Sequence, residues 1–126
     1  MDLAGRYNRG LEKLDEIHAG LGKQVMERLK EVCPDFERLT TEFAYGEIYN
    51  RPGLDLRTRQ LCTVAALTVL GNGAPQLKAH INGALNLGIS TQEIVEVIIQ
   101  MALYGGFHCA QNALFLAAEV FQERQR

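Results

Sequence analysis

A nearly continuous apolar block, running from Arg57 to Phe121, constrains the fold of this chain more than any other feature. Short glycine-containing breaks divide the block into segments of helical length, and apolar residues recur within them at spacings of three and four. This spacing is typical of helices that bury one face. Because the block holds few reactive side chains, few positions in it can carry chemistry.

Breaks and capping signals predict the individual helices. We expect helices over residues 2–18, over a continuation after Gly20, over a segment opened by Pro34, and over residues 56–70, 75–86, 91–104 and 107–122. In the segment opened by Pro34, the expected buried side consists of Phe36, Leu39, Phe43 and Ile48. Ser90 and Glu93 form a capping-box pattern before the helix at 91–104. The pattern predicts an all-α fold without strands.

The length of 126 residues suits one domain with a single core. The turn signal Asn50-Arg51-Pro52-Gly53 separates an N-terminal helical arm, residues 1–50, from the core block at 54–122. We interpret this turn as a hinge between layers of a single domain that covers residues 1–126.

Charge and hydropathy exclude several kinds of partner. The net charge is -2 with acids and bases mixed along the chain, which argues against a nucleic-acid partner. Charged residues interrupt the apolar block before it reaches membrane-spanning length, so no membrane partner is expected. The N-terminus shows no signal-peptide pattern, and a cytoplasmic location is predicted. Three cysteines without zinc-ligand spacing predict reduced thiols and no metal site.

The segment 91–104 is apolar around nearly its whole circumference, apart from a polar stripe of Glu93, Glu96 and Gln100. In so small a domain, a helix of this kind favours a subunit interface. We therefore predict a homo-oligomer.

His80 shares a helical stripe with Leu77 and Ile81, so its imidazole points where the apolar residues point. It is either a proton donor or acceptor at a catalytic site, or a hydrogen-bonded histidine of the core.

His108 and Cys109 follow Gly105-Gly106 at the start of the last helix. The N-terminal end of a helix favours an anion, so a reactive thiolate at Cys109 with His108 beside it is one interpretation. The other is that Cys109 is a small buried side chain.

Arg57 and Arg59 open a helix, where a positive charge is not electrostatically favoured. They either bind a substrate carboxylate or pair with an acid across a subunit boundary.

Four segments together resemble the carboxymuconolactone decarboxylase family. They read F-A-Y-G-E-I-Y at 43–49, L-D-L-R-T-R at 54–59, L-K-A-H-I-N-G-A-L-N-L-G-I-S at 77–90 and T-Q-E-I-V-E-V-I-I-Q-M-A-L-Y-G-G-F at 91–107. The resemblance implies the all-α fold of alkylhydroperoxidase D, with about six to seven helices, in a trimer or hexamer. It also implies decarboxylation of 4-carboxymuconolactone without metal or organic cofactor.

In that reaction the resemblance assigns the proton donor to His80. Arg57 or Arg59 would hold a carboxylate of the small-molecule substrate, with Gln60 in the same pocket. Backbone N–H groups near Gly106 would supply an anion nest.

The chain departs from the family pattern at two places. Gln60 stands where members usually carry an acid, and an amide cannot relay a proton. His108 and Cys109 stand where proline and small residues are usual, which suggests a changed substrate or reaction. The thiol pair of the peroxidase branch is also missing, since Gly73 and Gln76 stand at the corresponding positions.

Two alternative functions therefore remain beside the decarboxylase. One is a thiol-dependent peroxidase or reductase that uses Cys109 with His108. The other is a non-catalytic oligomeric protein that binds small carboxylates.

Overall fold

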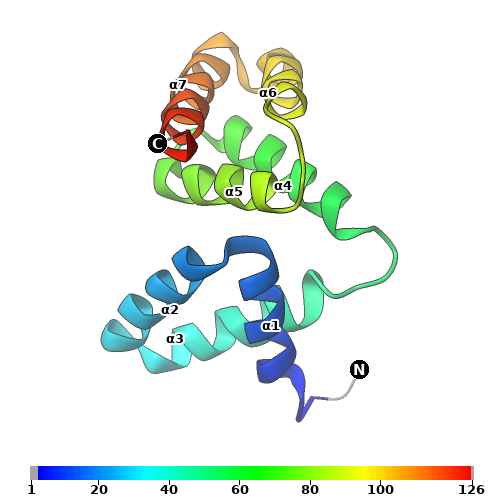
Figure 1. Ribbon diagram of the computed structural model, residues 1–126, viewed down its shortest axis with the longest axis vertical. Helices are drawn as coiled ribbons and strands as arrows, with labels where there is room; N and C mark the ends of the chain where they lie inside the picture. The colour runs from blue at the N-terminus through cyan, green and yellow to red at the C-terminus, as the bar shows by residue number, and fades with distance from the viewer. Residues whose placement is uncertain (1–2, 126) are drawn as a thin grey trace. The chain divides into compact units, whose positions relative to one another are not determined.

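The computed structural model describes residues 3–125, and this part of the chain consists of helices, turns and short connections without a strand. The prediction of an all-α fold is confirmed. The helices are α1 (Arg6–His18), α2 (Gly20–Val32), α3 (Pro34–Leu39), the π-helix η1 (Thr40–Ile48), α4 (Leu56–Leu70), α5 (Ala74–Asn86), α6 (Thr91–Gly105) and α7 (Phe107–Arg124) (Figure 1).

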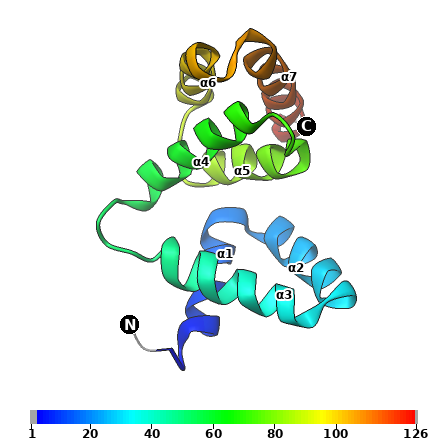
Figure 2. The ribbon, with the colours of Figure 1, turned by 180° about the vertical axis from the view of Figure 1, so that it is seen from behind.

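The chain divides into two compact units, Met1–Leu56 and Arg57–Arg126. This division lies close to the expected boundary between an arm at 1–50 and a core block at 54–122. In the first unit, α1 packs along η1, and α2 packs against α3. In the second unit, α7 packs against both α5 and α6, and Figure 2 shows these helices from behind. That the two units form one domain stays a prediction.

The boundaries of the helices follow local signals. The first helix begins at Arg6 and not at residue 2, because residues 3–5 form a bend and a turn; residue 2 itself lies outside the described residues. The capping box of α6 is confirmed: Ser90 Oγ accepts the Glu93 N–H at 3.0 Å, and a Glu93 carboxylate oxygen accepts the Ser90 N–H at 2.9 Å. These two bonds satisfy backbone donors that the first turn would otherwise leave unpaired.

The expected buried side of the segment after Pro34 is wrong. All four apolar side chains assigned to it are exposed, Phe43 for example to 57% of its surface. The four residues are Phe36, Leu39, Phe43 and Ile48. The buried side instead carries Glu37, Thr41 and Tyr45. The hydroxyls of Tyr7 and Thr41 donate to Glu37 Oε1 at 2.7 and 3.3 Å, so hydrogen bonds offset the burial of this carboxylate.

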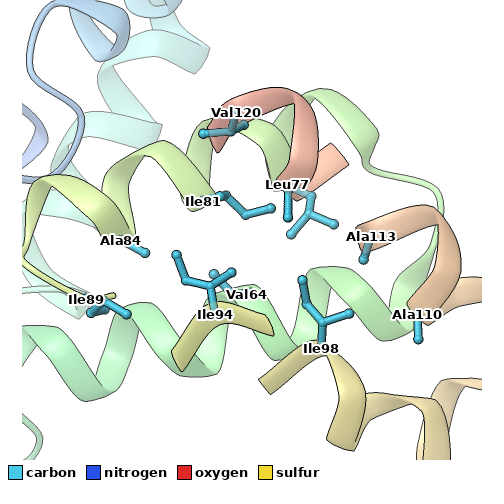
Figure 3. Packing of buried hydrophobic residues seen from close by; sticks show 11 residues of the cluster. Val64, Leu77, Ile81, Ala84, Ile89, Ile94, Ile98, Ala110, Ala113 and Val120 are labelled. Carbon is cyan, nitrogen blue, oxygen red and sulfur yellow. The ribbon is translucent and has the colours of Figure 1, made fainter. Parts of the chain in front are cut away.

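The core of the second unit is built from all four of its helices (Figure 3). Its buried members are Val64, Leu77, Ile81, Ala84, Ile89, Ile94, Ile98, Ala110, Ala113, Ala117 and Val120. The small side chains of α7 let the neighbouring helices approach closely. Gly105 serves the same purpose, because a Cβ there would lie 3.0 Å from the Val69 Cα. This packing fixes the backbones of α4 and α5, on which the main site candidates lie.

Candidate functional site

Gln60 of α4 and His80 of α5 are in direct contact. Gln60 Nε2 lies 3.1 Å from His80 Nδ1 and donates to the His80 backbone oxygen at 2.7 Å. The Gln60 side chain has 0% of its surface exposed, whereas His80 is half-buried. The family resemblance predicts that Gln60 binds substrate. In the structure its side chain contacts the imidazole of His80 and has no exposed surface.

Arg57 forms an ion pair with Glu93, and this pair links the first turn of α4 to the first turn of α6. The two side chains are 46% and 43% exposed. The Ser90 backbone N–H and the Arg57 guanidinium both donate to the Glu93 carboxylate, and together they hold its pKa below the usual value of about 4.5. The acid that Arg57 pairs with thus lies in the same chain. Arg59 is half-buried two residues further along α4.

Cys109 belongs to α7 and contacts the end of α4 that is opposite to Gln60. Its thiol donates to the Val69 backbone oxygen with a sulfur–oxygen distance of 3.7 Å, and a Cβ at Gly71 would lie 3.2 Å from the sulfur. Positions 60 and 69 of one helix are separated by about 13 Å. The structure therefore does not bring Cys109 to the contact between Gln60 and His80.

The remaining candidates lie near the start of α7. Gly106 caps α6 and precedes α7 with a φ of 96°, a conformation that favours glycine. His108 is exposed, while Cys109 is half-buried. Because the Cys109 thiol acts as a donor to a carbonyl, this geometry suits the protonated thiol and not a thiolate.

Two hollows lie in the second unit. The first has a volume of about 280 Å³ between α4, α5 and α7, and Thr68, Leu77, Cys109 and Phe115 are among its lining residues. The second has a volume of about 490 Å³ between α6 and α7, and its walls are almost entirely apolar. Leu103, 75% exposed, and Phe107 line this second hollow. An apolar surface of this kind is what the predicted subunit interface would need, and the oligomer stays a prediction.

One buried titratable pair was not predicted from the sequence. In the first unit, His18 Nε2 and the Tyr45 hydroxyl lie 2.9 Å apart, and the two rings meet edge to face at 5.7 Å. Burial, together with the neighbouring Tyr49, raises the pKa of Tyr45. The signal was available: Tyr45 lies in the segment 43–49, and His18 ends the first apolar helix. Neither side chain belongs to the unit that holds His80.

The described residues hold neither a metal cluster nor a membrane-spanning helix. Among residues 3–125, no three histidine, cysteine or acidic side chains are grouped so that they could hold a metal ion. Within the same part of the chain, every helix is too short or too polar to cross a membrane.

Comparison with known proteins gives one family and several relatives. The sequence profile of the Carboxymuconolactone decarboxylase family matches residues 34–119. The chain is 35% identical over 122 residues to the 4-carboxymuconolactone decarboxylase of Acinetobacter baylyi, covering 94% of this chain and 88% of the relative. It is 31% identical over 122 residues to the nitrosuccinic acid decarboxylase of Metarhizium robertsii, covering 93% and 82%. An uncharacterized 15.0 kDa protein of Paracoccus denitrificans is 35% identical over 123 residues, with 97% and 84% covered.

Proposed function

Since this chain belongs to the carboxymuconolactone decarboxylase family, we propose that it is a cofactor-free decarboxylase acting on a carboxylated lactone or a similar small acid. The observation that carries the proposal is the half-buried imidazole of His80, held by the buried amide of Gln60 on the packed helices α4 and α5. Two of the relatives are named as decarboxylases, one of 4-carboxymuconolactone and the other of nitrosuccinic acid. Decarboxylation of a small acid is therefore better supported than any one substrate.

The chemistry asks for three kinds of group. Loss of CO2 from 4-carboxymuconolactone leaves an electron pair that the conjugated lactone carbonyl takes up as a dienolate. A donor must stabilise the oxyanion, a cation must hold the carboxylates, and a proton must reach carbon. We place the His80 imidazole next to the part of the substrate that loses CO2.

Arg57 and Arg59 are assigned to a substrate carboxylate. Both lie in the first turn of α4, one turn or less from Gln60. The ion pair with Glu93 does not exhaust Arg57, because a guanidinium carries five N–H donors. Gln60 is assigned to His80, and no longer to the substrate, because its side chain is fully buried.

The backbone N–H groups beside Gly106 are retained as a candidate anion nest, and the trimer or hexamer is retained as the expected assembly. Support for the assembly comes from exposed apolar side chains on α6 and α7, including Leu103, Tyr104 and Phe107. The thiol-redox alternative has less support, because Cys109 makes a donor contact to a carbonyl and lies away from His80.

The test is a decarboxylation assay with freshly generated 4-carboxymuconolactone, and with nitrosuccinate as the second substrate, following CO2 release. We expect turnover by the parent protein and a loss of at least about 100-fold in kcat for His80→Ala. The matched control is Lys78→Ala, since Lys78 lies on the same helix but pairs at the surface with Glu123. A His80→Ala protein as active as the parent would remove His80 from the mechanism. Tight binding of either acid by a folded oligomer without CO2 release would favour the non-catalytic alternative.

A further inference from the structure

We propose that Gln60 holds His80 as a neutral imidazole with its proton on Nε2, so that His80 donates a hydrogen bond to the oxyanion and does not protonate carbon. The position of the proton follows from the two contacts of Gln60 with His80, whereas the role at the oxyanion rests on the proposed decarboxylase function. It replaces the role of proton donor that the family resemblance implies for His80.

The orientation of the Gln60 amide follows from its two contacts. Its nitrogen lies 2.7 Å from the His80 backbone oxygen, an acceptor without a proton, so the –NH2 end of the amide must face it. Turning the amide by 180° would put Oε1 against that oxygen, and two acceptors would then face each other at hydrogen-bond distance. The amide nitrogen is therefore fixed as the atom nearest to the imidazole.

The same nitrogen fixes the tautomer of His80. It lies 3.1 Å from Nδ1, and its second N–H can donate there only if Nδ1 carries a lone pair. A neutral imidazole has one protonated nitrogen, so the proton is on Nε2.

The contact also opposes the charged form. An imidazolium carries N–H groups on both nitrogens, so its Nδ1–H would point at the N–H of Gln60, two donors facing each other. Gln60 has 0% of its surface exposed, so water cannot take up the displaced hydrogen bond. The Gln60 Oε1 atom is itself buried without a hydrogen-bond partner among the described residues, so this orientation of the amide leaves one acceptor unsatisfied while its nitrogen makes both contacts to His80.

A neutral imidazole is suited to one of the two chemical roles and unsuited to the other. Giving up the Nε2 proton would leave an imidazolate, a species too basic to form at neutral pH, so neutral His80 is a poor acid toward carbon. Donating a hydrogen bond from Nε2–H costs no proton transfer, and a donor aimed at a developing oxyanion accelerates reactions by about 100- to 1000-fold.

The reaction then balances with water as the only co-reactant. The carbon–carbon bond to the departing carboxylate breaks, its electron pair passes into the conjugated lactone, and CO2 leaves. The negative charge gathers on the lactone carbonyl oxygen, which accepts the hydrogen bond from His80 Nε2–H. A water molecule then gives its proton to carbon, and the hydroxide that remains is neutralised by the buffer.

The first test reads the tautomer directly and needs no activity. Protein labelled with ¹⁵N-histidine is studied at about pH 6, where an unperturbed histidine is mostly protonated, and the His80 signals are assigned with His80→Gln. We expect one unprotonated nitrogen, Nδ1, and one protonated nitrogen, Nε2. In Gln60→Leu, which has no donor, the Nδ1 signal should move toward that of an imidazolium. An imidazolium, or a proton on Nδ1, in the parent protein would overturn the proposal even if the enzyme decarboxylates its substrate.

The second test separates a hydrogen-bond donor from an acid. Glutamine carries an N–H donor at about the position of Nε2 but cannot act as an acid. We expect the kcat of His80→Gln to be at least about tenfold higher than the kcat of His80→Ala, because part of the oxyanion stabilisation returns. Equal kcat values for the two variants, in proteins with matching thermal unfolding, would overturn the role at the oxyanion. If the parent shows no turnover, the proposed function fails, while the imidazole spectrum still decides the tautomer.

Discussion

Arg57 pairs with Glu93, and so links the first turns of two helices that begin 35 residues apart in the sequence. The same carboxylate accepts the Ser90 backbone N–H that starts α6. One exposed acid therefore both caps a helix and fixes the position of an arginine that we assign to the substrate.

The pH dependence of this arrangement can be checked with Glu93→Gln. The pKa of Glu93 is lowered by Ser90 first and by Arg57 second, so its contribution to stability is complete above the usual value of about 4.5 and is lost as the pH falls through the lower folded value. Glutamine keeps the capping hydrogen bonds but has no charge. We expect the parent to have the higher Tm at pH 7, and the difference to shrink as the pH falls below about 4.5. A difference that persists unchanged to pH 2.5 would contradict this account.

Gly10 should not accept a side chain. A Cβ there would lie 2.9 Å from Thr41 Cγ2 and equally close to the carbonyl carbon of the same residue, and the backbone of η1 cannot yield as a flexible side chain could. Gly10→Ala is expected to lower the free energy of unfolding by about 3 kcal/mol. The control is Gly20→Ala, where a Cβ would meet no atom within 4 Å. Urea unfolding of both variants checks the prediction, which fails if the two changes cost the same.

Replacing Ala19 by glycine should increase the stability of the protein. It connects α1 to α2 with φ 52° and ψ −138°, a region that non-glycine residues rarely adopt. Ala19→Gly is expected to raise stability by about 1 kcal/mol, since relief of the strain exceeds the added entropy of the unfolded chain. The same substitution at exposed Ala66, inside α4, should lower stability by about 1 kcal/mol. Changes of the same sign at both positions would show that the backbone at Ala19 is not strained.

The three thiols should differ in reactivity in an order that tests the redox alternative. Cys33 and Cys62 are exposed, whereas Cys109 is half-buried and donates to the Val69 carbonyl. Limited iodoacetamide treatment at about pH 7, read by peptide mass spectrometry, should label Cys33 and Cys62 before Cys109. In denaturant the three rates should converge. If Cys109 reacts first in the folded protein, that result would favour the peroxidase or reductase function over the decarboxylase.

Sequence patterns predicted the helices of the second unit well, because glycine turns and the capping box between Ser90 and Glu93 are local signals. They failed on the face of the segment after Pro34. For Phe43 and Ile48 one reason is local, since the chain passes from α-helix to π-helix at Thr40 and the period of 3.6 residues no longer applies. The hydrogen bonds of Glu37 to Tyr7 and Thr41 add a reason for burial that apolar periodicity does not contain.

The site was predictable in part. The apolar stripe of α5 identified His80, and the helix start identified Arg57. The partners of both depend on contacts between helices: Gln60 meets His80 from 20 residues away, and Glu93 meets Arg57 from 36 residues away. Periodicity places a residue on a face of its own helix, but the register between two packed helices fixes which side chains meet.

The π-helix at Thr40–Ile48 has a consequence for changes in chain length. Each hydrogen-bonded turn of a π-helix contains one residue more than a turn of α-helix. A single-residue deletion within this segment can therefore be absorbed by a return to α-helical winding, whereas a deletion inside α4 would rotate every residue that follows it in the helix. We expect a protein lacking Phe43, whose side chain is exposed, to fold, while one lacking Cys62 does not, as circular dichroism melting would show. On this account the first unit carries a segment that can lose one residue and still fold, whereas the helix that holds Gln60 cannot.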